Sequence, residues 1–358
     1  MKIGIITFHW ATNYGAILQA YALQSYLEEQ GNQVEVINYK PATHDLKFSH
    51  LFRDPRKLLH ISKFFQKKRK ESLLVPFREQ YLHQTQRFYC EEDLKEMSSQ
   101  YDVIISGSDQ VLNPSFTLYG ERKPTGVYYL SFVSGKAKKI AYAVSFGCNT
   151  YPDNAAKYAK VWIKYFDSIS VREHSGIEIV DQLGAKNPAV LVPDPVVLFG
   201  KQMFSRFYHY RIGAEPYVCV YSLRRELQLP NGFNYRRMDD IHRPVTMEEW
   251  ISTIACADML ITNSFHGMVV ALLNHVPFAI DIVGGRNRGM NDRFYTLLER
   301  LNLTSRICGE EYSLNELLNN RSIDWEYVDK ALDIVQTEGE DYLKTALGEA
   351  IDYTTVGS

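Results

Sequence analysis

The sequence lacks the features of several protein classes. It has five cysteines, and no two of them have the Cys-x-x-Cys spacing that is typical of zinc and redox sites. We therefore expect reduced thiols, no metal site and a cytoplasmic protein. No apolar run reaches the length of about 18 residues that indicates a membrane-spanning helix. The start of the sequence, "MKIGIITFHW", lacks the pattern of a signal peptide.

The sequence also has no strong excess of charge of either sign. Its 40 Lys and Arg residues nearly balance 42 Asp and Glu residues, which gives a formal net charge of -2. Domains that bind nucleic acid are usually strongly basic, so we expect no nucleic-acid partner. The first predicted strand is followed by neither GxGxxG nor GxxxxGK[ST], which disfavours dinucleotide-binding and P-loop sites.

What the sequence does contain is a repeated alternation of short apolar runs and helical segments. "KIGIITF" is typical of a buried strand, and it is followed by apolar residues at helical spacing, by Gly31 and by the strand "QVEVINY". A strand, a helix and a strand within about 40 residues predict a parallel βαβ unit. The strands predicted in this way are 2–8, 33–39, 101–107, 138–147, 167–173, 189–199, 217–223, 258–262 and 277–283.

This pattern predicts an α/β protein with two domains. The first covers residues 1–200 and the second covers residues 215–330, with a junction within 198–216. Residues 331–358 are expected to form a helical tail that crosses back to the first domain. In open α/β sheets ligands gather outside the carboxyl ends of the strands, so we expect a site at that edge.

A basic insertion interrupts the first domain at residues 45–100, and we predict that it is helical. Residues 53–70 contain eight Lys or Arg residues and one acid, and Leu58, Ile61 and Phe65 share one helical face. Such a basic amphipathic helix is typical of weak contact with a membrane surface or an acidic partner. The alternative is that its apolar face packs on the first domain.

Polar residues follow the predicted strands in four loops. Asn13 and Gly15 follow the first strand in "HWATNYGA", and Ser108 and Asp109 follow the third in "SGSDQVLNP". They are candidates for ligand contact, or else form a helix cap and a polar turn.

The other loops carry a cation and a titratable group. Arg172 in "SVREHSG" could donate two hydrogen bonds to a carboxylate or phosphate, or could form a plain surface ion pair. His266 in "NSFHG" stands at a helix start, where it could transfer protons or be merely structural. A further basic loop, "GGRNRGMNDRF", contains Arg288 and Arg293.

Taken together, these stretches resemble the polysaccharide pyruvyl transferase family. The resemblance rests on "TNYGAILQAYALQ", "SGSDQVLNP", "SVREHSG", "PDPVVL" and "ITNSFHGMVVALL", in that order, and covers nearly the whole chain except the insertion and the tail. It implies two Rossmann-like domains facing a cleft, as in GT-B glycosyltransferases. It also implies transfer of pyruvate from phosphoenolpyruvate to two hydroxyls of one sugar, with ketal formation and phosphate release, in the biosynthesis of cell-surface polysaccharide.

The resemblance also implies residue roles. His266 would be the acid/base group and Arg172 would bind the donor, without a metal or any cofactor beyond phosphoenolpyruvate as co-substrate. Some family members carry arginine at the position of Ser264, so Arg288 or Arg293 would have to replace that charge here. The full set of expected substrate-binding residues is Asn13, Tyr14, Gly15, Ser108, Asp109, Asn263, Ser264, Phe265, Gly267, Arg288 and Arg293.

The expected acceptor is a lipid-linked or nucleotide-linked sugar, which the protein would meet in the cytoplasm or at the inner face of the membrane. Two alternatives remain open. One is a glycosyltransferase of the same architecture that uses a nucleotide-activated sugar. The other is a glycan-binding protein without activity.

Overall fold

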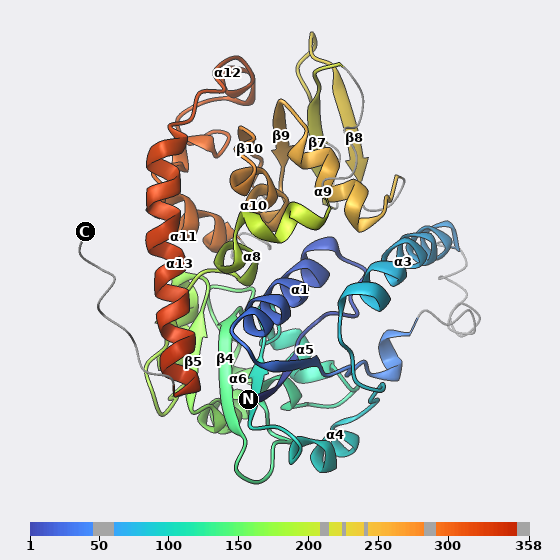
Figure 1. Cartoon of the computed structure of the whole chain (residues 1–358), viewed down its shortest axis with the longest axis vertical. Helices are drawn as coiled ribbons and strands as arrows, with labels where there is room; N and C mark the ends of the chain where they lie inside the picture. The colour runs from blue at the N-terminus through green and yellow to red at the C-terminus, as the bar shows by residue number, and fades with distance from the viewer. Residues whose placement is uncertain (46–60, 208–214, 224–226, 240–242, 283–290, 349–358) are drawn as a thin grey trace.

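The computed structural model describes residues 1–45, 61–207, 215–223, 227–239, 243–282 and 291–348, and it contains two parallel β-sheets (Figure 1). The first sheet has the strand order β2-β1-β3-β4-β5-β6, and the second has the order β10-β9-β7-β8. The first consists of β1 (Lys2–Ile6), β2 (Gln33–Val36), β3 (Val103–Ser106), β4 (Lys138–Val144), β5 (Ser168–Val171) and β6 (Val190–Leu191). The second consists of β7 (Val218–Ser222), β8 (Tyr235–Asp239), β9 (Met259–Thr262) and β10 (Phe278–Ile280).

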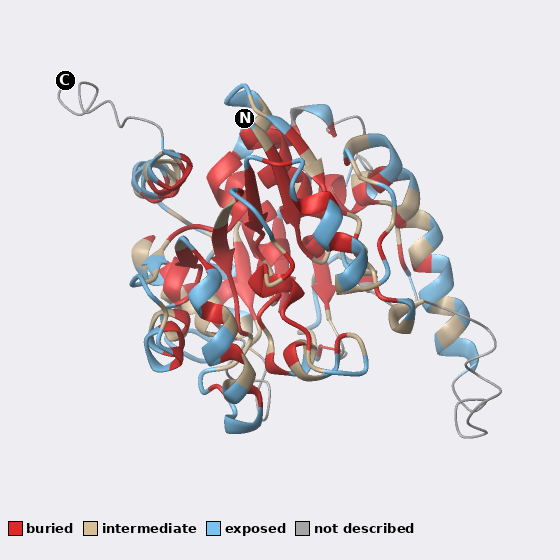
Figure 2. Ribbon diagram, turned by 90° about the horizontal axis from the view of Figure 1, so that it is seen from below, coloured by how far each residue is buried: buried red, intermediate tan, exposed pale blue. Residues whose placement is uncertain are grey.

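Helices cover both sheets, as parallel sheets require. They are α1 (Tyr14–Glu29), α3 (Ile61–Tyr81), α4 (Glu91–Ser98), α5 (Pro114–Tyr119), α6 (Asp153–Trp162), α7 (His174–Leu183), α8 (Pro195–Phe199), α9 (Met247–Ala255), α10 (Phe265–Leu273), α11 (Asp292–Arg300), α12 (Leu314–Asn319) and α13 (Trp325–Leu347). The strands β1, β3 and β9 are buried almost throughout, so the cores lie at the sheets (Figure 2). None of the described helices is long and apolar enough to cross a membrane.

One predicted strand is wrong, and one strand of the structure was not predicted. Residues 189–199 form only the two-residue strand β6, and the chain then enters α8. The carboxylate of Asp194 caps α8 by accepting a hydrogen bond from the Val196 N–H at 3.1 Å, and Pro195 occupies the first helical turn, where its missing N–H costs nothing. The strand β8 was not predicted, because "YRRMD" is mostly polar and lies at the edge of the second sheet.

The molecule has two halves, one built on the first sheet and one on the second, and the C-terminal helix α13 runs along both of them (Figure 1). The hydroxyl of Tyr342 in this helix donates a hydrogen bond to the carbonyl oxygen of Ala141 in β4 at 2.9 Å. Gly339 lies so close to Pro193 and Tyr142 that a Cβ there would be within 2.9 Å of both side chains. The helix therefore packs directly on the first sheet.

The insertion contributes α3 and α4, but the prediction that it is helical is wrong for residues 82–90, which run extended beside the end of β2 and form isolated bridges to Val36 and Tyr39; residues 46–60 lie outside the described residues. Only the second half of α3 packs on the body, through the buried side chains of Lys70, Leu74, Phe77 and Arg78.

The two halves are joined by an aromatic stack at the start of α1. The Tyr14 ring stacks on Trp250 of α9 with centroids 5.1 Å apart and an interplanar angle of 2°. The Tyr14 hydroxyl donates to the Val245 carbonyl at 2.8 Å and accepts from the Val245 N–H at 2.9 Å. Tyr14 is 1% exposed, so this side chain links the halves and does not face solvent.

We predict that Tyr14→Phe lowers the free energy of unfolding by roughly 1–3 kcal/mol, because it leaves two partly buried backbone groups of Val245 without this partner. Urea titration measures the loss. The matched control is Tyr119→Phe, whose ring is 66% exposed and whose loss should stay within about 0.5 kcal/mol. Equal stability of Tyr14→Phe and the wild type would contradict the prediction.

Candidate active site

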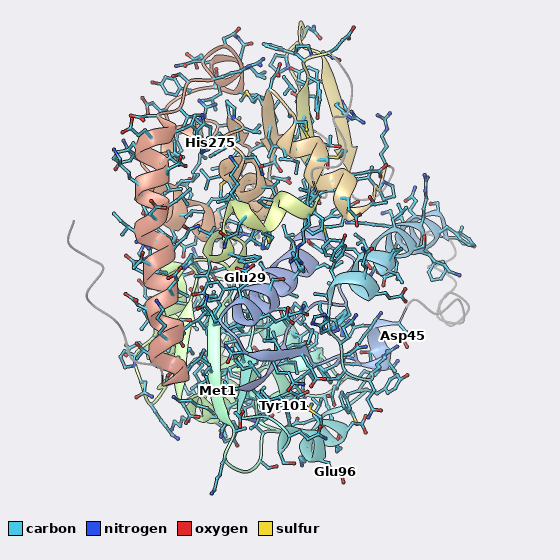
Figure 3. The ribbon with its side chains drawn as sticks, viewed as in Figure 1. Met1, Glu29, Asp45, Glu96, Tyr101 and His275 are labelled. Atoms are coloured by element: carbon cyan, nitrogen blue, oxygen red, sulfur yellow. The ribbon has the colours of Figure 1, made fainter. Side chains whose placement is uncertain are left out.

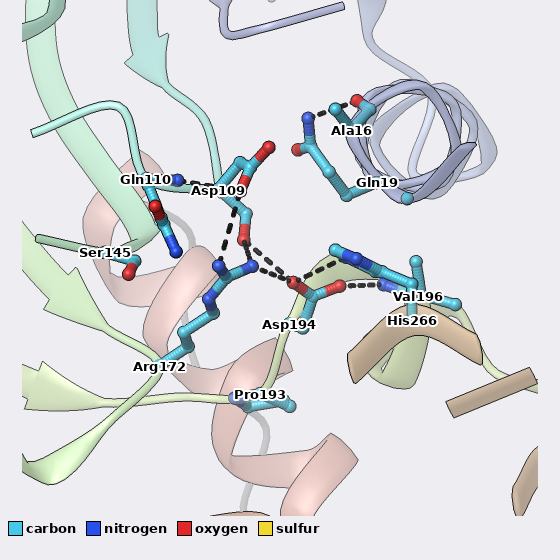
Figure 4. Close-up of polar contacts among 12 residues, drawn as sticks. Ala16, Gln19, Asp109, Gln110, Ser145, Arg172, Pro193, Asp194, Val196 and His266 are labelled. Atoms are coloured by element: carbon cyan, nitrogen blue, oxygen red, sulfur yellow. Dashed lines mark hydrogen bonds and ion pairs between the residues drawn. The ribbon is translucent and has the colours of Figure 1, made fainter. Parts of the chain in front are cut away.

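The buried carboxylate of Asp194 joins two side chains from opposite halves of the chain (Figure 4). Its Oδ2 accepts a hydrogen bond from Nη1 of Arg172 at 2.7 Å and lies 3.3 Å from Nε2 of His266. The Ser108 hydroxyl donates to the same oxygen at 2.9 Å. The side chains of Arg172, Asp194 and His266 are 1%, 0% and 7% exposed, so water is largely excluded from these contacts.

The fold brings these residues together because they all follow parallel strands. Ser108 follows β3, Arg172 follows β5, and Asp194 follows β6, at one edge of the first sheet. His266 lies in the first turn of α10, directly after β9 of the second sheet. The carboxyl edges of the two sheets therefore meet at this cluster.

Asp109 extends the cluster and has an unusual backbone. Its Oδ1 lies 3.5 Å from Nη2 of Arg172 and accepts a hydrogen bond from the Gln110 N–H at 2.8 Å. Its φ of 83° is in the left-handed region that residues other than glycine rarely adopt. Such backbone conformations are concentrated at functional sites, where the surrounding structure holds them in place.

The charges of the cluster stabilise one another. Burial by itself would raise the pKa of the Asp194 carboxyl, but His266, Arg172 and the Val196 N–H together lower it. Burial opposes the charge of Arg172, yet Asp194, Glu173 and Asp109 raise its pKa. Asp194 and Arg172 are therefore ionised partners, as a buried ion pair must be.

A second arginine and a second carboxyl lie beside this pair. The guanidinium groups of Arg172 and Arg293 lie 5.6 and 5.4 Å from the centroid of the same ring, that of Phe265. Burial and the charge of Arg172 lower the pKa of Arg293 to about 10. Burial raises the pKa of Glu173, whose Oε2 is 3.4 Å from Nε of Arg172.

Four buried polar atoms of this group have no hydrogen-bond partner among the described residues. They are Nε of Arg172, Oε2 of Glu173, Nε2 of His266 and Nε of Arg293. The contacts of Arg172 with Glu173 and of His266 with Asp194 are close ion-pair contacts without hydrogen-bond geometry. Buried polar groups are nearly always paired, so a concentration of unpaired ones indicates a functional site.

The comparison with family models identifies the kind of protein. The model described as polysaccharide pyruvyl transferase matches residues 13–280, which include every residue of the cluster except Arg293. The chain belongs to the polysaccharide pyruvyl transferase family. No protein of curated function is similar enough in sequence to match it.

Solved structures are similar to this family member in fold alone. The UDP-N-acetylglucosamine 2-epimerase from Rickettsia bellii has a TM-score of 0.55 at 7% identity, covering 97% of this chain and 96% of that one. Arabidopsis thaliana UGT89C1, complexed with UDP-L-rhamnose, has a TM-score of 0.51 at 8% identity, covering 97% and 98%. The pyruvyl transferase family member thus has the two Rossmann-like units of a GT-B-like protein, as predicted.

Several residues expected to bind substrate make structural contacts in this protein. Asn13 and Ser264 cap α1 and α10 by accepting backbone N–H groups of the first turn. Asn263 bonds to the backbone N–H and carbonyl of Leu223, which fixes the loop after β7. Gly267 packs against Thr262, Ser264 and Tyr221. Arg288 lies outside the described residues.

Asp194 and Glu173 were not among the predicted site residues. Asp194 lies in "PDPVVL", which was interpreted as the end of a strand. The signal that was missed is an aspartate before a proline, which is typical of a helix start and would have placed this carboxylate in a loop after a strand. Glu173 follows Arg172 directly, and nothing in the sequence indicates that it is buried.

A separate crevice lies near the C-terminal ends of α1 and α10, whose N-terminal turns contain Gly15 and His266. Its volume is about 480 Å³, and it is lined by Glu29 at the end of α1, His275 after α10, and residues of α13 (Figure 3). It contains no residue of the Asp194 cluster. Among the described residues, no group of three or more His, Cys, Asp and Glu side chains is arranged to hold a metal ion.

Gly15 is required by the position of His266. A Cβ at Gly15 would overlap the imidazole, with Nδ1 and Cγ as its nearest atoms. The His266 ring therefore packs against the first turn of α1, and its Nε2 points toward Asp194.

We predict that Gly15→Ala displaces the His266 ring and therefore reduces any activity that depends on His266 to nearly the level of the His266→Ala variant. The measurement is turnover of each variant, with folding checked by circular dichroism. Gly31→Ala is the control for destabilisation by loss of a glycine: its Cβ meets no atom within 4 Å, but its φ of 80° strains an alanine, so this variant should lose stability and keep its activity. Full activity of Gly15→Ala would refute the assigned contact.

A second buried histidine of the first half, His9, lies in the turn that follows β1. It is 0% exposed, and its ring nitrogens contact the Thr7 carbonyl at 3.1 Å and Oδ1 of Asn38 at 3.2 Å. Burial lowers its pKa to about 4, so it is neutral near pH 7. It is therefore a structural residue. His174 is exposed, and His242 lies outside the described residues.

This burial predicts a dependence of stability on pH. Between its usual pKa and about 4, the unfolded chain binds a proton at His9 that the folded chain does not bind. The contribution of neutral His9 is therefore complete above about pH 6.5 and is lost as the pH falls, by up to about 3 kcal/mol at pH 4. Comparing urea unfolding of the wild type and His9→Gln from pH 7 to pH 4 should show a shallower decline in the variant. Parallel curves would contradict this.

Proposed function

We propose that this protein transfers pyruvate from phosphoenolpyruvate to two hydroxyls of a sugar. The proposal rests on the cluster of His266, Asp194 and Arg172 at the edges of both sheets, with its four unpaired buried polar atoms. Membership of the family supports a transferase that acts on polysaccharide or its precursors. The donor and the ketal product belong to the proposal.

The donor carries a carboxylate and a phosphate, so its site needs at least two fixed cations. Arg172 and Arg293 share the Phe265 ring, and the Nε–H of each makes no hydrogen bond to the described residues. A guanidinium suits such oxyanions, because it is planar and always charged. Ser264 stands where some members have arginine, and we assign that missing charge to Arg293.

The reaction requires protons to move at each step. An acid protonates the methylene carbon of phosphoenolpyruvate, and a sugar hydroxyl forms a bond to the neighbouring carbon and loses its proton. A second hydroxyl of the same sugar displaces phosphate at that carbon, and its proton is released with the phosphate. His266 is the group that we assign to proton transfer, since imidazole can be both acid and base near neutral pH.

Asp194 is the positioning residue in this scheme. It holds Nε2 of His266 at 3.3 Å and Nη1 of Arg172 at 2.7 Å, so one carboxylate sets the distance between the proton-transfer group and the donor-binding group. Because all three side chains are nearly inaccessible, we infer that the two halves move apart to admit the donor and close over it.

Partly exposed aromatic side chains in and around the loop after β1 suit a sugar acceptor. The rings of Phe8, Trp10 and Phe116 are neither fully buried nor fully exposed, and Phe8 and Phe116 contact the Tyr128 ring, which is within electrostatic reach of Asp109. Aromatic rings with few polar groups are the usual lining of small-molecule sites. We expect the acceptor to lie on this side of Arg172.

The decisive experiment compares donors. Phosphoenolpyruvate should raise the melting temperature of the protein, and nucleotide-sugars should not. Phosphate should then be released from phosphoenolpyruvate in the presence of a suitable member of a panel of lipid-linked and nucleotide-linked sugars. A shift with a nucleotide-sugar alone would favour a glycosyltransferase, and a shift with glycans alone would favour a binding protein.

We predict that His266→Ala retains the fold and loses roughly 100-fold or more of the phosphate release. Arg172→Lys should also lose activity, because lysine cannot make the planar two-point contact. The control is His83→Ala, whose side chain is 65% exposed and lies at Glu28, away from the cluster. Activity of His266→Ala equal to that of His83→Ala would remove His266 from the mechanism.

A further inference from the structure

The first half of α3 exposes both apolar and basic side chains. Phe65 is 53% exposed and Ile61 is 38% exposed, among the more exposed large apolar residues of the described chain. The neighbouring side chains of Lys63, Lys67, Lys68 and Arg69 are exposed as well. Figure 2 shows this end of the helix extending from the body with little buried surface.

Ile61 and Phe65 lie on the side of α3 opposite the buried Leu74. Phe65 and Leu74 are nine positions apart, about two and a half helical turns, so they point to opposite sides of α3. Leu74 is 0% exposed and packs on the body, which leaves Phe65 on the outer side. Ile61 is four positions before Phe65 and shares its face, and Lys68 and Arg69 flank that face. Much of the surface of these two residues is therefore exposed on the side of α3 that does not pack on the body through Leu74, while Leu58 of the same predicted face lies outside the described residues.

This end of the helix differs in charge from the rest of the protein. Residues Ile61–Lys70 contain five Lys or Arg residues and no acid, whereas the whole chain has a formal net charge of -2. Lys70 is buried with its ammonium 4.3 Å from the centroid of the Tyr14 ring, so it belongs to the body. The other four cations are exposed and form a local basic surface.

The second half of α3 is held firmly beside the candidate active site. Oε2 of Glu71 accepts a hydrogen bond from the Thr12 hydroxyl at 2.7 Å, and Glu71 also pairs with Arg78. Thr12 belongs to the loop that leads to Gly15 and thus to His266. Whatever binds the first half of α3 is therefore placed at a fixed orientation to the site.

We propose that the outer face of α3, formed by Ile61, Phe65, Lys68 and Arg69, docks this protein on an anionic lipid bilayer, with Lys63 and Lys67 adding positive charge from the opposite side of the same turns. An aromatic and an aliphatic side chain flanked by lysines is the composition of helices that lie in the membrane interface. The apolar pair enters the headgroup region, and the cations are attracted to the negative surface. An acidic protein surface would pair with the cations but would not bury the exposed apolar surface of Phe65 and Ile61.

Docking goes beyond the proposed function and can be tested without any donor or turnover. The full-length protein should co-sediment at low ionic strength with vesicles of phosphatidylglycerol in phosphatidylcholine, and not with phosphatidylcholine alone. Binding should weaken steeply as salt rises, because such attraction is screened over about 10 Å at 0.1 M. Absence of binding to the anionic vesicles at low salt overturns the proposal and leaves the proposed function untouched.

Matched variants separate this face from general electrostatics. Reversal of Lys67, Lys68 and Arg69 to Glu should reduce vesicle binding at least tenfold. Reversal of Lys157, Lys160 and Lys164, which are exposed on and after α6, changes the net charge equally and should leave most of the binding. Equal loss in both triple variants would mean attraction by overall charge and would refute docking through α3.

The apolar contribution has its own comparison. Phe65→Ala should weaken binding severalfold, while Tyr119→Ala, at a ring that is 66% exposed, should not. Unchanged binding of Phe65→Ala would overturn insertion of this face and favour a purely anionic partner. Hydrogen exchange of the wild type requires no variant: anionic vesicles should slow exchange over 61–69, and unchanged exchange there would also refute the proposal.

Discussion

The carboxylate of Asp194 lies between a guanidinium from the first half of the chain and an imidazole from the second. A charged group that is 0% exposed is stable only if partners replace the water that it has lost, and Arg172, Ser108 and the Val196 N–H do so within 3.1 Å. His266 approaches the same oxygen from α10. Removing one partner of such a pair leaves an uncompensated charge, which typically costs about 3–5 kcal/mol. The relative position of the two sheets therefore depends on the Asp194 carboxylate and on the partners that stabilise its charge.

The same constraint explains the packing around the cluster. His266 can reach Asp194 only by lying on the first turn of α1, and Gly15 is the residue that leaves room for its ring. One residue earlier, Tyr14 stacks on Trp250 and fixes α1 against α9. Stability and the proposed chemistry thus depend on the same turn of helix. The insertion extends this connection outward, because Lys70 and Glu71 hold α3 against that turn.

Much of the architecture could be predicted from the sequence. Buried parallel strands are apolar over several residues, as in "KIGII" and "VIIS", and the helix after "TNYGA" has a cap, helical spacing and a glycine stop. The four polar loops after strands were visible for the same reason. The failures have physical causes: β6 is short because a capped helix begins at Asp194, and β8 is an edge strand whose polar residues give no apolar run.

The sequence by itself determined the two α/β units, the family and the positions of Arg172 and His266 at strand ends, because these follow from local periodicity and from motifs of adjacent residues. Only the tertiary structure decided that Asp194 joins them, that Glu173 is buried, and that Tyr14 and Asn263 hold the fold together. These properties depend on contacts between residues far apart in the sequence. Asp194 and His266, for example, are 72 positions apart, and the order of the strands and the packing of the helices bring them together. The direction of Phe65 was decided in the same way: its helical face could be read from the sequence, but which side of α3 meets the body depends on Leu74 and Phe77.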